Sequence, residues 1–269
     1  MLLYDFLKKV EEFNLPLSFG LDLASYILSV SYEDVKSLYY TDIDDNKVEQ
    51  VFSQLKDHIP VAYITGRKEF YGREFLVDEN VLIPRVETEI LVEEVLKRYN
   101  NHGNLDIIDI CSGSGAIGLT IMQEIANCHM TLLDISPKAI YISKKNAEKF
   151  NIKNNIEYIC DDILLYTSDK KYDIVLCNPP YISFEEYAWL EEEVKKEPVI
   201  ALTADDNGLL FYKNILGKFP ILCKKSGVMF FEIGAAQADD VKKIAENNNL
   251  YAECIKDYSV NDRVIIVHS

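Results

Sequence analysis

The sequence predicts an α/β protein in which a mostly parallel sheet follows a small helical domain. From about residue 85, strand-like apolar runs alternate with helix-like stretches, a pattern typical of a parallel sheet covered on both faces. Before residue 60, apolar residues recur at helical spacing instead. A chain of 269 residues is long enough for one large and one small domain. We therefore expect a helical domain at 1–60, a hairpin linker at 61–84 and an α/β domain at 85–269.

Two apolar stripes in the N-terminal part predict amphipathic helices. Their members are Leu3, Phe6, Leu7, Val10 and Phe13 in the first stripe and Val48, Val51, Phe52, Leu55 and Ile59 in the second. Pro60 stops the second stripe, and Ser31–Asp34 between the two resembles a capping box that opens a further helical turn. After them, Phe70–Val77 predicts a short hairpin that turns at Gly72.

The α/β part contains strand-like runs separated by stretches that favour helices. The predicted strands are Leu105–Ile110, Met130–Leu133, Ile156–Cys160, Asp173–Cys177 and Val228–Phe231, and the predicted helices include Ala116–Ala126, Pro137–Phe150 and Leu209–Phe219. At the end of the chain, Tyr251–Ile255 and Val264–Val267 predict an antiparallel hairpin. Ligands on such sheets bind at the carboxyl ends of the strands, so the loops that follow the strands form the candidate site.

The segment Asn178-Pro179-Pro180-Tyr181 follows one of these strands and carries the strongest chemical signal. Two consecutive prolines fix their φ angles and donate no backbone hydrogen bonds, so the loop is stiff. An NH2 group could donate one hydrogen to the Asn178 side-chain oxygen and the other to the Pro179 carbonyl, with its plane against Tyr181. Such a loop would hold a nitrogen for attack on a carbon electrophile, although a strand-ending turn explains Pro-Pro alone.

A glycine-rich loop follows the strand Leu105–Ile110 and opens the next predicted helix. Gly113, Gly115 and Gly118 fit the pattern G-x-G-x-x-G, in which backbone N–H groups face a bound ligand. The pattern suits a nicotinamide dinucleotide or S-adenosylmethionine equally. Asp134 ends the following strand, where a carboxylate accepts hydrogen bonds from ribose hydroxyls, unless it only caps the helix at Ser136-Pro137.

Charge and composition exclude several classes of protein. The formal net charge is −16, which disfavours broad binding to a phosphate backbone. No apolar run approaches about 18 residues, and the N-terminus lacks an apolar signal segment, so we expect no membrane span and a cytoplasmic protein. The six cysteines include no C-x-x-C pair, which indicates reduced thiols and no metal site.

With these motifs in place, the chain resembles the glutamine methyltransferases that modify peptide chain release factors. The resemblance runs nearly end to end, through Pro60–Gly66, Val81–Glu89, the glycine loop, Asp134–Pro137, Asn178–Ile182, Glu197-Pro198, Ala201-Leu202, Asn207–Leu209, Glu232–Gly234 and Asp262–Val264. The Asn-Pro-Pro-Tyr motif is shared with adenine-N6 and other nitrogen methyltransferases, so it specifies only the chemistry. The resemblance in the Ile83-Pro84-Arg85 segment and in the helical N-terminal domain is what implies release factors as the substrate.

Four residues depart from the pattern of that family. Val86 replaces a usual proline, and Ala204-Asp205 replace two usual glycines. Ile163 stands where some relatives place an aromatic side chain beside the adenine, so apolar contact would replace stacking there.

The resemblance implies a Rossmann-like class I methyltransferase with a mostly parallel seven-stranded sheet and a C-terminal antiparallel hairpin. Its cofactor would be S-adenosylmethionine, and its partner a class 1 release factor methylated on the glutamine of a Gly-Gly-Gln motif, with the helical domain docking that partner. The implied cofactor-binding residues are Cys111, Ser112, Gly113, Ser114, Gly115, Asp134, Asp162, Ile163 and Asn178. The implied catalytic residues are Asn178, Pro179 and Tyr181, and the implied substrate-binding residues are Arg85, Asn178, Pro179, Pro180 and Tyr181.

Two other classes stay open at this point. A nucleic-acid nitrogen methyltransferase would use the same Asn178 loop, but the acidic balance and the lack of a basic, aromatic-interleaved stretch argue against it. A nicotinamide-dependent oxidoreductase would use the glycine loop but would leave Asn178–Tyr181 unexplained.

Overall fold

A computed structural model describes residues 1–100 and 102–269 of the chain. These residues form two compact units: the first comprises Met1–Arg67 with Glu191–Lys196, and the second comprises Lys68–Leu190 with Glu197–Ser269. The division differs from the expected ranges, because the first unit continues past residue 60 to Arg67 and takes in a short segment from late in the chain.

The first unit is helical. Its helices are α1 (Leu3–Glu11), α2 (Leu17–Leu28), α3 (Tyr32–Val35), α4 (Asp45–Lys56), α5 (Val61–Thr65) and the 3-10 turn η2 (Val194–Lys196). Both predicted stripes are confirmed, because Leu3, Phe6, Val48 and Val51 lie in one buried core. Helix α5 falls in the range expected to be a linker; it begins after Pro60 and ends at Gly66, whose φ of 72° is the left-handed conformation that ends many helices.

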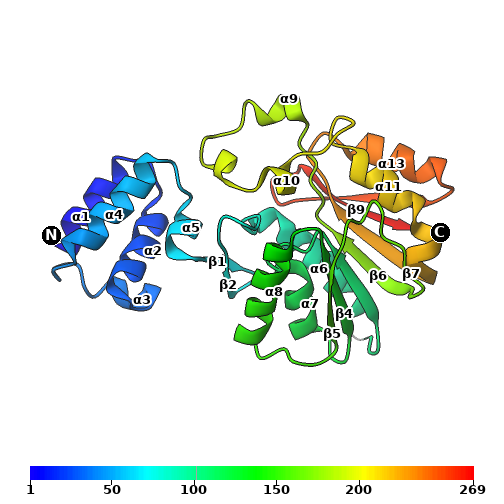
Figure 1. Ribbon diagram of the computed structural model, residues 1–269, viewed down its shortest axis with the longest axis horizontal. Coiled ribbons are helices and arrows are strands. Elements are labelled where there is room, and N and C mark those ends of the chain that lie inside the picture. Colours follow the sequence, from blue (N-terminus) through cyan, green and yellow to red (C-terminus); the bar gives the residue numbers. More distant parts are fainter. Residues whose placement is uncertain (101) are drawn as a thin grey trace. The chain divides into compact units, whose positions relative to one another are not determined.

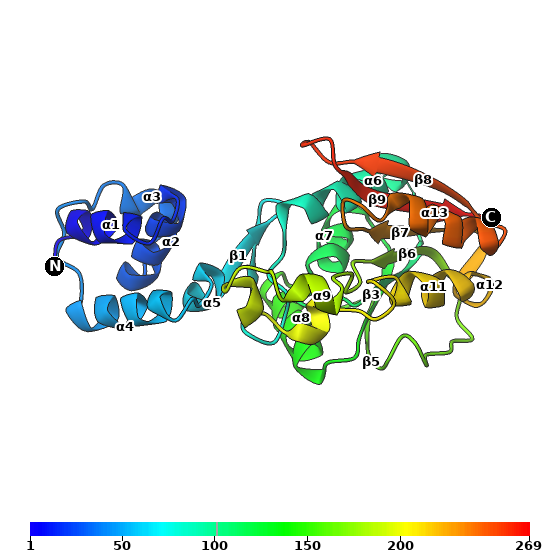
Figure 2. The same ribbon diagram turned by 90° about the horizontal axis from the view of Figure 1, so that it is seen from above.

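The second unit is built on a seven-stranded sheet (Figure 1). Its strands are β3 (Asp106–Ile110), β4 (His129–Asp134), β5 (Ile156–Cys160), β6 (Tyr172–Cys177), β7 (Cys223–Glu232), β8 (Tyr251–Lys256) and β9 (Asp262–His268), in the order β5-β4-β3-β6-β7-β9-β8. Strands β3 to β7 pair in parallel, and β9 pairs antiparallel with β7 and β8, which confirms the predicted parallel sheet and the C-terminal hairpin. Figure 2 shows β5 and β8 at opposite edges.

Helices cover both faces of this sheet. One face holds α6 (Glu89–Tyr99), α7 (Ala116–Glu124) and α8 (Pro137–Lys149), and the other holds α11 (Leu210–Gly217), α12 (Phe219–Leu222) and α13 (Ala238–Asn247). Side chains alternate along each strand between these layers: Ile107 and Ile174 face the first, whereas Ile108 and Val175 face the second. Two buried layers explain why the strands are apolar almost throughout.

Shorter elements complete the second unit. They are β1 (Arg67–Phe70), whose first residue still belongs to the first unit, β2 (Arg73–Leu76), the 3-10 turn η1 (Val86–Thr88), α9 (Phe184–Tyr187) and α10 (Val199–Leu202). The predicted hairpin is present: β1 and β2 form a two-stranded sheet and turn at Tyr71 and Gly72, both with positive φ.

The described part of the chain gives two further findings on covalent and membrane features. None of its helices has the length and apolar content needed to span a membrane. Its six cysteines are all free thiols.

Candidate active site

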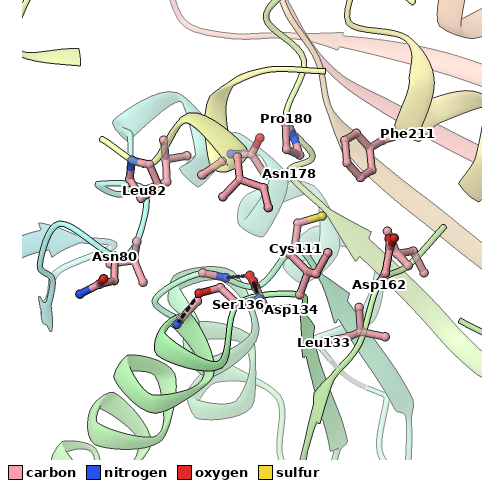
Figure 3. Close-up of a pocket in the computed structure, with 18 of the residues that line it drawn as sticks. Asn80, Leu82, Cys111, Leu133, Asp134, Ser136, Asp162, Asn178, Pro180 and Phe211 are labelled. Carbon is pink, nitrogen blue, oxygen red and sulfur yellow. Dashed lines mark hydrogen bonds between the residues drawn. The ribbon is translucent and has the colours of Figure 1, made fainter. Parts of the chain in front are cut away.

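A pocket lies at the carboxyl ends of β3, β4, β5 and β6, where the loops after these strands meet (Figure 3). Figure 3 shows Asn178 and Pro180 across the pocket from Asp134 and Ser136, with Cys111 between them. Its lining comprises Asn80, Val81, Leu82, Cys111, Gly113, Leu133, Asp134, Ile135, Ser136, Ala139, Asp161, Asp162, Ile163, Leu164, Asn178, Pro180, Pro198, Ile200, Ala201 and Phe211. The pocket therefore joins the two motifs that the sequence singled out.

The glycine loop reaches the pocket through Cys111 and Gly113. Gly113 has a φ of 53°, and a Cβ built on it would meet no atom within 4 Å, so its backbone is open to a ligand. Gly118 has a different role: a Cβ there would lie 2.6 Å from Leu132 Cδ2, so this glycine allows α7 to pack against β4. The distinction separates a ligand-facing glycine from a packing glycine within one motif.

The other predicted residues of this loop do not line the pocket. Gly115 is the N-cap of α7, Ser112 is buried, and the Ser114 carbonyl accepts a hydrogen bond of 2.9 Å from Asn146 Nδ2. Ser112, Ser114 and Gly115 therefore do not contact a ligand through the pocket wall, and their part in cofactor binding stays a prediction.

Asp134 connects the loops after β3 and β4. One carboxylate oxygen accepts from the Gly113 N–H at 2.9 Å, and the other accepts from the Ser136 N–H at 2.9 Å. Burial raises the pKa of Asp134, while these two hydrogen bonds act in the opposite direction. Each oxygen keeps a further lone pair for a ligand hydroxyl. Asp134 thus shapes the loop and also lines the pocket.

Asp109 supports the glycine loop from below, inside the sheet. Its Oδ2 accepts from the Gly118 N–H at 2.9 Å, and its Oδ1 has no hydrogen-bond partner among the described residues. Burial raises the pKa of Asp109 to about 7. The charge of Asp134 raises this pKa further, whereas the hydrogen bond from Gly118 lowers it.

The wall after β5 is formed by Asp162 and Ile163. The Ile163 side chain is buried, and Asp162 Oδ1 accepts from the Leu164 N–H at 2.9 Å, which fixes the turn. Phe211 also lines the pocket, from α11, and supplies an aromatic face there.

The Asn178 loop contributes Asn178 and Pro180 to the wall, whereas Pro179 and Tyr181 do not line it. Asn178 Nδ2 donates to Thr88 Oγ1 at 3.4 Å, so the amide nitrogen is engaged by the protein and the oxygen is left for a ligand. Burial raises the pKa of Tyr181, which keeps its hydroxyl protonated.

The backbone of Tyr181 is held by a neighbouring loop. Its carbonyl accepts from Gln237 Nε2 at 3.1 Å, and a Cβ on Gly208 would collide with that carbonyl oxygen at 2.0 Å. In this loop Ala204-Asp205 lead into a turn with positive φ at Asp206, Asn207 and Gly208. The chain therefore closes against the Asn178 loop without the glycine pair that the family usually has.

Arg85 lies outside the pocket lining and orients the segment that precedes η1. Its guanidinium donates to the Ile83 carbonyl at 3.0 Å and forms an ion pair with the buried carboxylate of Glu197. Glu197 also accepts from the Ile83 N–H at 3.0 Å. In the structure Arg85 therefore orients a loop, and its implied contact with substrate stays a prediction.

Several lining residues escaped sequence reasoning. Asn80, Val81 and Leu82 come from the connection after β2, and Ile200 and Ala201 come from α10. The only signal in the sequence for these residues was the family resemblance, which includes Val81–Glu89 and Ala201-Leu202. No periodicity or motif chemistry indicated that they line the pocket.

Comparisons with known proteins agree on the family. Residues 86–197 match the family model described as methyltransferase small domain. The release factor glutamine methyltransferase of Clostridium acetobutylicum is 37% identical over 91% of this chain and 88% of its own length. The protein of the same name from Bacillus subtilis is 39% identical over 78% of this chain and 75% of its own. The chain belongs to the release factor glutamine methyltransferases.

A solved structure supports the fold separately. A methyltransferase from Pyrococcus furiosus superposes with a TM-score of 0.54 at 15% identity, covering 83% of this chain and 96% of its own. The expected α/β methyltransferase fold is therefore confirmed, and so is the family named from the sequence.

The residues of the pocket fit the cofactor that such a fold implies. The open space over Gly113 lets a ligand approach the protein backbone closely. The Asp134 carboxylate suits a pair of ribose hydroxyls. Ile163, buried at the pocket edge, offers an apolar surface for an adenine ring. These are features on which S-adenosylmethionine could be held, with Asn178 at the opposite wall.

Proposed function

We propose that this protein uses S-adenosylmethionine to methylate the side-chain amide nitrogen of a glutamine, that of the Gly-Gly-Gln motif in class 1 release factors. One observation carries the proposal: Asn178 and Pro180 line the same pocket as Gly113 and Asp134, so a hydrogen-bonding site for an NH2 group adjoins the cofactor features. The family relationship supports the choice of release factors, and the acidic chain fits a protein substrate better than a nucleic acid.

The protein's main task in this reaction is to position a poor nucleophile. A carboxamide nitrogen shares its lone pair with the carbonyl, so it must be held at near-attack distance, where positioning supplies up to about 7–11 kcal/mol. The Asn178 oxygen and the Pro179 carbonyl accept the two hydrogens of the NH2 group and fix its orientation. Bound S-adenosylmethionine supplies a methyl group on a positively charged sulfur.

The pocket walls also exclude water and leave proton transfer to solvent. Leu82, Ile163, Pro180 and Phe211 are apolar walls that shield the reacting atoms. No histidine is among the described lining residues, so we expect no dedicated general base and loss of the proton to water after transfer.

The decisive experiment is mass spectrometry of a recombinant release factor after incubation with enzyme and S-adenosylmethionine. We expect a gain of one methyl group on the Gly-Gly-Gln glutamine and none on a release factor in which that glutamine is replaced by alanine. A DNA or RNA oligonucleotide serves as the competing substrate. Methylation of the oligonucleotide, with the release factor unmodified, would assign the protein to the nucleic-acid methyltransferases instead.

Asn178→Ala tests whether the loop acts on the nucleophile. We expect kcat to fall by about 10²-fold or more, the scale of losing one preorganised hydrogen-bonding group, with a far smaller change in cofactor affinity. Single-turnover methylation as fast as in the unmodified enzyme would remove Asn178 from the mechanism.

A further inference from the structure

A buried carboxyl group, that of Glu232, lies beside the Asn178 loop at the end of β7. Cys177 pairs with Phe231 between the parallel strands β6 and β7, so Asn178 and Glu232 are the next residues at the same edge of the sheet. The Glu232 side chain is 1% exposed, and its Oε1 lies 3.5 Å from Tyr181 Oη. Its Oε2 has no hydrogen-bond partner among the described residues. A buried polar atom without a partner costs roughly 1–3 kcal/mol, so stability alone does not explain this carboxyl group.

Thr88 lies between Glu232 and Asn178. Its Oγ1 accepts the hydrogen bond from Asn178 Nδ2 at 3.4 Å, and the same hydroxyl lies beside the Glu232 carboxyl. A threonine hydroxyl has one hydrogen to donate, and once it accepts from Asn178 that hydrogen is free to point at the carboxylate. Thr88 is itself buried, so water does not compete for these groups.

We propose that Glu232 and Thr88 are positioning residues, which through a chain of hydrogen bonds from Asn178 to Thr88 to Glu232 keep the Asn178 oxygen turned toward the substrate NH2 group. The inference rests on the proposed function. An asparagine amide can rotate by half a turn, and the rotated form would present its NH2 group to the substrate NH2 group. In the proposed arrangement the Thr88 hydroxyl donates its hydrogen to the Glu232 carboxyl, so it can only accept from Asn178, which selects the productive orientation. Glu232 holds the Tyr181 hydroxyl by the same carboxyl group.

This chain of hydrogen bonds is sensitive to the charge of Glu232. Burial raises the pKa of Glu232 to about 7, while the Thr88 hydroxyl and the nearby arginines act in the opposite direction. A carboxylate accepts from both hydroxyls, whereas the protonated group brings a hydrogen of its own and weakens the preference. The titratable and charged groups that face Glu232 are Arg263 on β9, Arg85 and Glu87 near η1, Tyr181 after β6, and Tyr212 on α11.

Glu232→Gln tests the charge, because the amide still offers an oxygen but does not titrate. With saturating cofactor, we expect the single-turnover rate of the unmodified enzyme to drop up to about tenfold from pH 8 to pH 6, as the ionised fraction falls around a pKa near 7. The Glu232→Gln rate should be flat over this range, with unchanged cofactor affinity. Asp109→Asn removes the other buried carboxyl with a similar pKa. Whatever its effect on the absolute rate through the glycine loop, the fall in rate at acid pH should persist in it.

Thr88 provides an independent test that does not depend on Glu232→Gln folding. Thr88→Val keeps the shape and removes the hydroxyl, so methylation should slow about tenfold or more with unchanged cofactor affinity, and Thr88→Ser should restore most of the rate. Thr120→Val is the control, because Thr120 is equally buried on α7 and its hydroxyl has no partner among the described residues.

The inference is overturned if Glu232→Gln keeps the acid fall in rate, or if Thr88→Val is as fast as Thr120→Val. Failure of the unmodified enzyme to methylate release factor would overturn the proposed function instead.

Discussion

Asp134 accepts a hydrogen bond from the Gly113 N–H at 2.9 Å, so the residue that ends β4 also fixes the loop that follows β3. The sequence offered two roles for Asp134, a ribose-binding carboxylate and a cap for the next helix. The structure gives it a turn-forming contact at Ser136 and a position on the pocket wall at the same time. The N-cap of α8 is Ser136 rather than Asp134, because the Ser136 side chain accepts from the Ala139 N–H at 3.2 Å. The ribose-binding role of Asp134 stays a prediction that substitution tests.

Asp134→Ala should weaken S-adenosylmethionine binding by about 1.5–3 kcal/mol, the scale of a hydrogen bond to a charged group. Asp134→Asn keeps one oxygen as an acceptor and should lose less. Isothermal titration calorimetry measures both variants, and thermal unfolding reports the loss of the turn contacts. Unchanged affinity in a folded Asp134→Ala variant would reduce Asp134 to a residue that only holds the Gly113 and Ser136 backbone.

Gly113→Val should abolish cofactor binding, because its Cβ branch would occupy the open space that faces the pocket. Gly72→Val is a matched control: Gly72 also has a positive φ, of 67°, and also has nothing within 4 Å of its Cβ position, but it lies in the β1–β2 turn. Both variants carry the left-handed backbone cost of roughly 1–2 kcal/mol. Only Gly113→Val should lose the thermal shift that S-adenosylmethionine produces; near-normal affinity in that variant would contradict the placement.

Arg85→Ala should lower the free energy of unfolding by about 1–3 kcal/mol, because it leaves the buried Glu197 carboxylate without its partner. The double variant Arg85→Ala/Glu197→Gln should recover much of that loss, since the amide oxygen still accepts the Ile83 N–H and carries no charge. Denaturant unfolding of both variants measures the difference. Equal stability of the single and double variants would show that the ion pair contributes little.

The pH dependence of stability should change in Asp109→Asn. The folded-state pKa of Asp109 is raised to about 7 from an ordinary value of 3.8, so the folded protein binds this proton more tightly than the unfolded chain does. The contribution is fully present below pH 4 and is lost as the pH rises to 7, with a slope of at most about 1.4 kcal/mol per pH unit. Unfolding experiments from pH 4 to pH 8 should show the unmodified protein losing stability relative to Asp109→Asn over that range. A constant difference between the two proteins would refute the raised pKa.

The sheet and the loops at its strand ends were predictable, because parallel strands bury both faces and their carboxyl ends share one edge. That rule alone brings Gly113, Asp134 and Asn178 together, as the structure confirms. The pocket positions of Leu82, from the connection after β2, and of Phe211, from α11, were not predictable, since they depend on tertiary packing rather than on periodicity.

Local sequence rules for caps and helices predicted some elements and missed others. Ser31 caps α3 by accepting from the Asp34 N–H at 3.2 Å, as predicted, yet the reciprocal capping box forms at Ser183 and Glu186, which no apolar pattern marked. Helix α5 was missed because it is too short for a periodic stripe. The partner of Asn178 was missed for another reason: Thr88 is 90 positions away, and a hydrogen bond at that separation leaves no trace in spacing.

The assignment of Glu191–Lys196 to the first unit means that the chain crosses between the units at three peptide bonds, after Arg67, Leu190 and Lys196. No single cut releases the helical unit intact, since a fragment ending at Arg67 lacks six of its residues and a protein beginning at Lys68 exposes them. To study the helical unit by itself, the segment Glu191–Lys196 must be joined to Met1–Arg67 or the chain must be circularly permuted, because a simple truncation does not suffice. It also means that an insertion or a proteolytic nick near residue 190 disturbs both units at once.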